Sequence, residues 1–242
     1  MTDNTTSHIS SVYDSQVNAT IPFYSEFHRA AIDLALSVNQ APNAWLDTGC
    51  GTGNLCMTAC QKLPDTAFTL ADPSPQMLDI AKEKLRDIPN INFMQSDSQN
   101  LDCESNTFDV ITAIQCHHYL NRKSRKSAIK NCFRMLNPNG VFITFENILP
   151  LSETGVQIAL KRWGGFQMAR GKSREETENH LKRFNNEYFP ITISEHIDLL
   201  KEAGFVSVEI LWASYMQAGF YAIKPFDVKI PLAPNTVIAR LF

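Results

Sequence analysis

Three glycines and an acidic residue lie together in the segment Trp45-Leu46-Asp47-Thr48-Gly49-Cys50-Gly51-Thr52-Gly53. Alternate glycines after an apolar run allow the backbone to turn sharply and to approach a ligand closely, and a following helix would present free N–H groups. A dinucleotide-binding loop has the spacing G-x-G-x-x-G, whereas the third glycine here comes one residue early and Asn54 holds its place. The Asp47 carboxylate would repel a pyrophosphate and attract an ammonium group. The segment therefore predicts a loop that binds a ligand bearing a positive charge.

A second acidic residue, Asp72, closes the apolar run 67–71 and is followed by Pro73. A carboxylate has two oxygens and can accept hydrogen bonds from both hydroxyls of a vicinal diol, so Asp72 is a candidate diol ligand. Both Asp47 and Asp72 would also serve as helix caps at strand-to-helix turns. Ligand binding is the interpretation that two acids and three glycines together favour.

Apolar runs alternate with helical patterns between residues 44 and 146, which is typical of a parallel sheet with helices on both faces. The predicted strands are one that ends at Trp45-Leu46 and those at 67–71, 91–94, 108–114 and 141–146. The predicted helices are 55–63, 75–86 and 122–136, the last of them stopped by Asn137-Pro138-Asn139-Gly140. The sequence thus predicts a doubly wound, mostly parallel, seven-stranded α/β sheet.

The alternation breaks after the fifth strand. Residues 151–190 read as amphipathic helices without a strand, which indicates a helical cap inserted between sheet elements. A further helix at 194–203 ends at Gly204. The runs 206–213 and 219–224 are joined by a turn too short for a parallel crossover, so the last strand should be antiparallel. We expect the cap to contact the acceptor through Arg162, Trp163, His180 and Arg183. The alternatives are packing in the core for Trp163 and a solvated face for the charged residues.

The two ends of the chain complete a single domain over residues 1–242. Residues 1–38 are expected to form a helical lid that closes over the bound ligand. The tail 225–242 contains three prolines and many apolar residues, so it should pack on this domain or on a second subunit in a homodimer.

Composition excludes several classes of function. Hydrophobic residues at 44% and charged residues at 19% are typical of a globular chain, and no apolar run approaches the length of a membrane-spanning helix. The polar first ten residues do not resemble a signal peptide, so we expect a cytoplasmic protein without a membrane partner. A net charge of -3 disfavours nucleic acid as a partner. The six cysteines lack zinc-type spacing, and no metal site is expected.

The segment 46–53 resembles the first motif of the class I S-adenosylmethionine-dependent methyltransferases, and later motifs of that family recur in order at 70–78, 96–101, 108–120, 136–140 and 199–205. The resemblance implies methyl transfer from S-adenosylmethionine, with S-adenosylhomocysteine as product. Asp72 would bind the ribose hydroxyls and Asp97 the adenine amino group, although Asp97 also suits a turn. The cofactor contacts implied are Asp47, Gly49, Cys50, Gly51, Gly53, Asp72, Pro73, Met77, Asp97, Ser98 and Gln115.

Within that family the chain is similar to the carboxy-S-adenosylmethionine synthases. Ile21-Pro22-Phe23-Tyr24-Ser25 is similar to their V-P-G-Y-S segment, and 212–224 follows the same style of ending. Two positions depart from that group: the synthase loop lacks the glycine found here at Gly51, and Leu181 aligns with the carboxylate-binding arginine, Arg183 being two residues away. Methyl transfer to a small molecule is therefore the first expectation. The alternatives are modification of the cofactor itself, as part of tRNA-modification chemistry, and non-catalytic cofactor binding.

His117 and His118 follow the run 108–114, at the end of a strand where α/β sheets bind ligands. One of them would act as a base near the methyl acceptor, and Tyr24 would face the same site from the lid. Packing in the core is the alternative for all three side chains.

Overall fold

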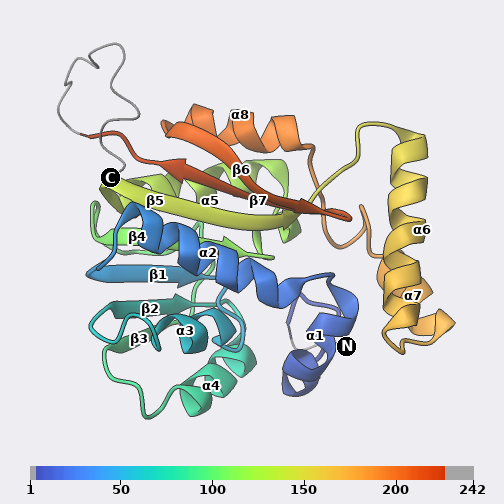
Figure 1. Ribbon diagram of the computed structural model, residues 1–242, viewed down its shortest axis with the longest axis horizontal. Helices are drawn as coiled ribbons and strands as arrows, with labels where there is room; N and C mark the ends of the chain where they lie inside the picture. Colours follow the sequence, from blue (N-terminus) through green and yellow to red (C-terminus); the bar gives the residue numbers. More distant parts are fainter. Residues whose placement is uncertain (1–3, 227–242) are drawn as a thin grey trace.

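The computed structural model describes residues 4–226, which form a seven-stranded sheet in the order β3-β2-β1-β4-β5-β7-β6 (Figure 1). The strands are β1 (Ala44–Thr48), β2 (Ala67–Ala71), β3 (Ile91–Met94), β4 (Phe108–Ile114), β5 (Leu136–Asn147), β6 (Val206–Ser214) and β7 (Gln217–Ile223). The helices are η1 (Ser10–Val12), α1 (Tyr13–Thr20), α2 (Tyr24–Val38), α3 (Asn54–Ala59), α4 (Pro75–Lys84), η2 (His117–Tyr119), α5 (Arg122–Met135), α6 (Glu153–Ala169), α7 (Arg174–Leu181) and α8 (Ile193–Ala203). Most of the predicted tail, 227–242, lies outside the described residues.

Pairing within the sheet confirms the predicted fold class. Strands β1 to β5 pair in parallel, whereas β7 is antiparallel to both β5 and β6. The order reverses direction at β1, which lies between β2 and β4. In open α/β sheets such a switch point, at the carboxyl ends of the strands, is where ligands bind.

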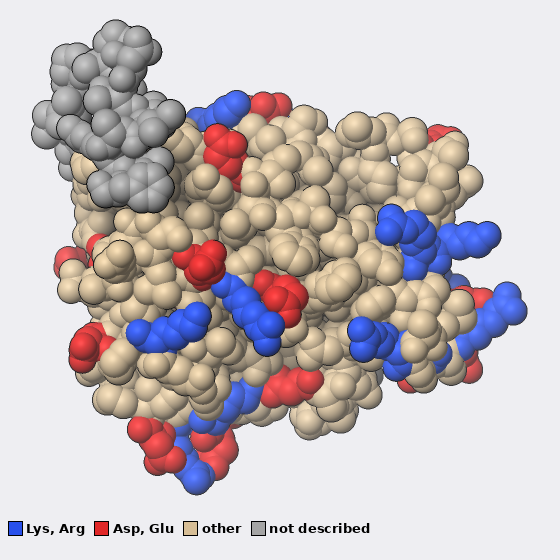
Figure 2. Space-filling model, viewed as in Figure 1, with Lys and Arg blue, Asp and Glu red and all other residues tan. Residues whose placement is uncertain are grey.

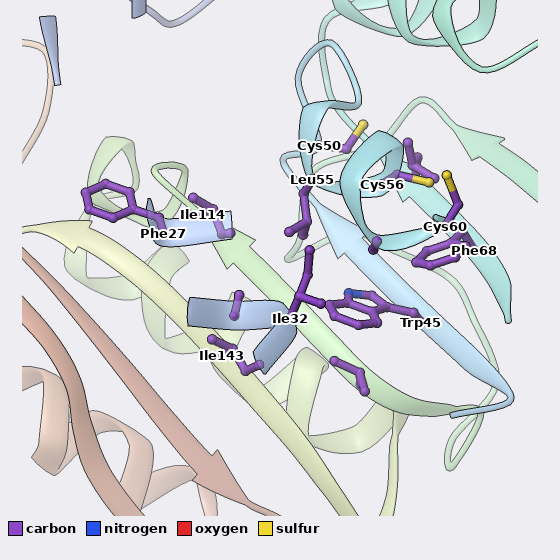
Figure 3. Packing of buried hydrophobic residues seen from close by; sticks show 14 of the residues in the cluster. Phe27, Ile32, Trp45, Cys50, Leu55, Cys56, Cys60, Phe68, Ile114 and Ile143 are labelled. Carbon is purple, nitrogen blue, oxygen red and sulfur yellow. The ribbon is translucent and has the colours of Figure 1, made fainter. Parts of the chain in front are cut away.

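Two hydrophobic clusters cover the two faces of the sheet, because successive residues of a strand point to opposite sides. Trp45 belongs to the cluster under α2, α3 and α4, and the adjacent Leu46 belongs to the cluster under α5 and α8. Figure 3 shows the first cluster, in which Cys50, Cys56 and Cys60 lie among the apolar side chains. These three cysteines are free thiols, and burial raises the pKa of each.

Helices α6 and α7 form the segment predicted as a cap. They stand beyond one end of the sheet, next to α1 (Figure 1). Ser173 and Glu176 form a capping box that begins α7. The buried Trp163 of α6 donates a hydrogen bond from Nε1 to the carbonyl of Thr20 at 2.7 Å, which joins the cap to the N-terminal helices.

The sequence placed some boundaries wrongly. Helix α3 ends at Ala59, so the predicted helix 55–63 is too long, and α4 ends at Lys84 rather than at residue 86. Strand β5 begins at Leu136, so the predicted turn at 137–140 is part of an irregular strand. Asn139 adopts a left-handed conformation there (φ 62°), and Asn137 donates to the Asp109 carboxylate at 2.7 Å.

Among residues 4–226, no helix combines the length and the apolar character needed to cross a membrane.

Candidate active site

The glycine loop follows β1 and is hydrogen-bonded to the end of β2. The backbone N–H groups of Gly49 and Cys50 both donate to the carbonyl of Ala71, at 2.7 and 3.0 Å. Gly49 and Gly51 have φ angles of 71° and 54°, a region that side chains with a Cβ rarely adopt. A Cβ on Gly49 would lie 2.4 Å from Cβ of Cys116, whereas no described atom lies within 4 Å of a Cβ on Gly51. The loop is therefore packed at Gly49 and open at Gly51.

Asp72 joins the glycine loop to α4. One carboxylate oxygen accepts from the N–H of Gly51 and the other from the N–H of Ser74, both at 2.9 Å. Ser74 in turn caps α4 by accepting from the N–H of Met77. Asp72 is buried, and this burial raises the pKa of its carboxyl group. Each oxygen can accept a second hydrogen bond from a ligand.

A cavity of about 410 Å³ opens at this edge of the sheet. Its volume lies in the range of small-molecule sites. Eleven of the fourteen predicted site residues line it: Tyr24, Gly49, Cys50, Gly51, Asp72, Pro73, Met77, Asp97, Ser98, Gln115 and His117. Ten further residues line the cavity and were not predicted as site residues: Asn4, Thr5, Thr6, Tyr13, Ser74, Pro75, Ile114, Cys116, Tyr119 and Leu120.

Two of the predicted cofactor contacts, Asp47 and Gly53, are not among the lining residues. Asp47 is buried behind the loop and accepts from Oγ1 of Thr112 at 2.7 Å. Burial raises the pKa of Asp47 to about 7, and the hydrogen bond from Thr112 opposes this rise only in part. Gly53 is the N-cap of α3, and a Cβ there would lie 2.9 Å from Leu85. These two residues support the loop from behind.

His117 faces the cavity as a neutral side chain. Its Nε2 lies 2.9 Å from Oγ of Ser98, which is itself 2.7 Å from Oγ1 of Thr48. Burial lowers the pKa of His117 to about 4. His117 is therefore a weak base that is already hydrogen-bonded to its neighbour.

The structure places His118 outside the cavity. Its Nδ1 lies 2.7 Å from Oε2 of Glu146, and both groups are almost fully buried. Glu146 also accepts from the backbone N–H groups of His117 and His118. Burial opposes ionisation of Glu146, but the hydrogen bond and charge of His118 outweigh it and hold the pKa of Glu146 at about 2. This arrangement fixes the loop after β4 and leaves His118 without access to the cavity.

Tyr24 and Tyr13 bring the N-terminal helices to the cavity wall. The Tyr13 hydroxyl donates to the Tyr24 hydroxyl at 3.2 Å, and the two rings meet edge to face. Burial raises the pKa of both phenols well above 10. Both therefore remain protonated at neutral pH and act as hydrogen-bonding groups, not as bases.

Asp14 of α1 is a further residue that the sequence analysis missed. Its Oδ1 accepts from Oγ1 of Thr52 at 2.6 Å and from Nδ2 of Asn54 at 2.8 Å, and its Oδ2 accepts from Nζ of Lys84 at 2.7 Å. Asp14 thereby attaches α1 to the glycine loop and to α4. These partners lie at least 38 residues away in the chain, so local sequence patterns carry no signal for them.

Asp14→Asn is expected to weaken cofactor binding by roughly fivefold. Loss of the charge removes the ion pair with Lys84 and one strong hydrogen-bond acceptor, so α1 is attached less firmly to the glycine loop and α4. Loss of a partly exposed ion pair of this kind costs about 1 kcal/mol. Calorimetric titration would measure the change. Asp33→Asn, at an exposed position of α2, is the control and should bind as the unmodified chain does. Equal affinities for the two variants would show that the contacts of Asp14 with the glycine loop and α4 do not affect cofactor binding.

Comparison with known proteins gives consistent findings. A family profile described as "Methyltransferase domain" matches residues 46–140. The chain is 25% identical to carboxy-S-adenosyl-L-methionine synthase of Nautilia profundicola over 217 residues, which cover 89% of this chain and 92% of that protein.

Solved structures of methyltransferases share the fold. N-methyltransferase NodS from Bradyrhizobium japonicum, in complex with S-adenosyl-L-homocysteine, matches 84% of this chain and 88% of its own, with a TM-score of 0.60 and 19% identity. Human N-acetylserotonin methyltransferase matches 89% of this chain, with a TM-score of 0.59 and 16% identity. This chain spans 58% of the length of that human protein.

Proposed function

Because this chain belongs to the class I S-adenosylmethionine-dependent methyltransferases, we propose that it transfers the methyl group of S-adenosylmethionine to a small-molecule acceptor. The observation that carries the proposal is the cavity itself. The glycine loop and Asp72 form one wall, and Tyr13 and Tyr24 of the N-terminal helices form another.

The residues present fit this cofactor. Gly51 leaves open space beside the loop, and Asp72 retains acceptor capacity on both oxygens for two ribose hydroxyls. Asp97 and Ser98 line the cavity beyond β3, where the adenine would lie. Asp47, behind the loop, has a pKa of about 7, and the charge of a bound methionine ammonium would favour its ionised form without direct contact.

When bound, S-adenosylmethionine supplies an activated methyl group on a positively charged sulfur. The task of the chain is to hold the acceptor in line with the bond that breaks and to exclude water. Tyr13, Tyr24 and Tyr119 crowd the cavity with protonated phenols, and His117 is a weak base. We therefore infer that the acceptor brings its own nucleophile, either a lone pair on a neutral amine or a group already ionised at neutral pH.

We also propose roles for the segments around the sheet. Residues 1–38 act as the lid and residues 151–190 as the cap, and together they restrict the acceptor to a small molecule. Contact between α1 and α6, through Trp163 and Thr20, supports this pairing of lid and cap. We also propose that the apolar tail supports a homodimer. Analytical ultracentrifugation would test this by measuring the molecular mass of the protein in solution.

A second candidate is a synthase-like reaction that modifies the cofactor. The 25% identity to carboxy-S-adenosyl-L-methionine synthase extends over 89% of this chain, well beyond the glycine loop and its neighbours. Under this alternative the ligand that co-purifies with the protein would carry a carboxyl group on its sulfonium substituent.

Transfer of a labelled methyl group tests the proposal. The purified chain is incubated with S-adenosylmethionine carrying a tritiated methyl group and with either a small-metabolite extract or the macromolecular fraction. The proposal expects label in small molecules whose mass has grown by one methylene. Label only in macromolecules would contradict the small acceptor. Tight cofactor binding without any transfer would favour a non-catalytic role.

A further inference from the structure

Two smaller hollows continue from the main cavity toward the surface of the cap. The first, here called the inner chamber, has a volume of about 30 Å³ and shares Thr6, Tyr13, Gln115 and Tyr119 with the main cavity. The second, here called the vestibule, has a volume of about 250 Å³ and shares Ser7, His8, His180 and Arg183 with the inner chamber. The three spaces thus form a row from the glycine loop to the gap between the N-terminal segment and α7.

The inner chamber contains two buried polar atoms without a partner among the described residues. They are the hydroxyl of Tyr188, whose residue is 1% exposed, and Oε1 of Gln115, whose residue is 8% exposed. Nε2 of Gln115 already donates a hydrogen bond to the carbonyl of Phe145. Leaving such groups unpaired costs about 1–3 kcal/mol each, so a bound molecule is expected to complete them. Oε1 of Gln115 needs a donor, whereas the Tyr188 hydroxyl can donate to an acceptor. The Tyr188 phenol stays protonated because burial raises its pKa.

One guanidinium group, that of Arg183, lies in the wall of the inner chamber. Arg183 is 9% exposed, and its Nη2 donates to the carbonyl of Thr5 and its Nε to Glu187, each at 2.7 Å. Lys172 lines the vestibule together with one acid, Glu176. Figure 2 shows lysine and arginine side chains gathered over this cap end of the molecule.

Two histidines that line the vestibule, His8 and His180, lie in the electrostatic field of Lys172 and Arg183. Burial, helped by the charges of Lys172 and Arg183, lowers the pKa of His8 to about 4 and that of His180 to about 3. Both rings are therefore neutral at pH 7. The acid paired with Arg183, Glu187, is 60% exposed, so water screens its charge more than it screens the guanidinium of Arg183, whose side chain is 10% exposed. An anion in the chamber would be stabilised by this arrangement.

We propose that the acceptor is a small carboxylic acid whose carboxylate binds in the inner chamber, against the guanidinium of Arg183 and the hydroxyl of Tyr188. This inference rests on the proposed function and specifies the acceptor of that reaction. The chamber holds little more than one carboxylate group. The remainder of the acceptor extends past Gln115 and Tyr119 into the main cavity, where its nucleophile meets the methyl group.

Acetate is the test probe, since it fits the chamber whatever the rest of the acceptor is, and acetamide is its uncharged counterpart. Both are titrated into the chain saturated with S-adenosylhomocysteine, and histidine ring signals are followed by NMR. Acetate is expected to bind at least about tenfold more tightly than acetamide and to raise the pKa of His8 and His180. Tyr188→Phe and Arg183→Gln should each remove most of this preference. Arg174→Gln is the matched control, because Arg174 of α7 is exposed, pairs with Glu178 and lines none of the three spaces, so it should leave acetate binding unchanged.

The outcomes separate the two proposals. Equal binding of acetate and acetamide, with normal binding of S-adenosylhomocysteine, overturns the carboxylate site and leaves the proposed function standing. Failure to bind S-adenosylhomocysteine overturns the proposed function. A carboxylated S-adenosylmethionine that binds about tenfold more tightly than S-adenosylmethionine, with the difference lost in Tyr188→Phe, would place the carboxylate on the cofactor and also overturn this proposal. If Arg183→Gln fails to fold, because Arg183 holds the N-terminal segment, Tyr188→Phe decides alone.

Discussion

Gly49→Ala is expected to abolish binding of S-adenosylmethionine, with a loss of affinity above about 100-fold. The new Cβ would lie 2.4 Å from Cβ of Cys116 and 2.8 Å from its sulfur, and the φ angle of 71° would be strained. Left-handed strain costs about 1–2 kcal/mol and overpacking about 1–3 kcal/mol, so the loop would leave the carbonyl of Ala71. Calorimetric titration and urea denaturation would measure the loss of affinity and the loss of stability.

Substitutions of two other glycines distinguish the effect of backbone strain from the effect of a steric clash. Gly51 has a φ angle of 54° but no described atom within 4 Å of a built Cβ, so Gly51→Ala should show the strain alone. Gly165 lies within α6, and Gly165→Ala should be neutral or stabilising by up to about 1 kcal/mol. If Gly49→Ala bound the cofactor as well as Gly165→Ala does, the close contact with Cys116 would not control the site.

The free energy of unfolding is expected to fall steeply as the pH drops from 6.5 toward 4. Five buried histidines have pKa values lowered by burial from 6.5: about 4 for His8, His28, His117 and His196, and about 3 for His180. Between pH 4 and 6.5 these histidines are protonated in the unfolded chain and neutral in the folded chain, so the free energy of unfolding rises with pH.

Asp47 acts in the opposite direction. Burial raises its pKa to about 7, so in this window the folded chain holds a proton that the unfolded chain releases. Five protons gained on unfolding less one lost leave four, which corresponds to a slope of at most roughly 5 kcal/mol per pH unit. Burial also raises the pKa of Asp72, which lowers the slope further. Urea denaturation at a series of pH values would measure it.

His196→Phe provides an internal control for the pH profile. The His196 ring stacks on Phe220 with centroids 4.9 Å apart, and its Nε2 has no partner in the described part of the chain. A phenylalanine should keep the stacking, and the slope should decrease by about one proton. A flat stability profile between pH 6.5 and 4.5 in the unmodified chain would contradict the burial of these histidines.

Local patterns predicted the strands well, because β2, β3 and β4 are short apolar runs bounded by turn residues. Their observed limits, Ala67–Ala71, Ile91–Met94 and Phe108–Ile114, match the predicted ranges. The start of β5 was wrong because pairing of Leu136 with Phe108 extends the strand through a proline-containing segment. Tertiary pairing decided that boundary, and the local sequence contains no sign of it.

The candidate site also contains some residues that the local sequence predicts and others that depend on tertiary contacts. The glycine loop and Asp72 were recognised because their residues are contiguous and follow strands. The orientation of His118 depends on Glu146, 28 residues away, so sequence placed both histidines in the site where the structure places only His117. Asp14 and Tyr188 were missed because their neighbours come from the glycine loop, the N-terminal segment and the cap.

The most direct test is a calorimetric titration of S-adenosylmethionine into the unmodified chain, Asp72→Ala and the control Asp79→Ala. Asp79 is exposed on α4, away from the cavity. If Asp72 binds the ribose, Asp72→Ala loses hydrogen bonds worth about 1.5–3 kcal/mol each, so its affinity falls by at least about tenfold while Asp79→Ala binds normally. Binding that is unchanged in a folded Asp72→Ala, or absent in the unmodified chain, would contradict a cofactor site at this cavity.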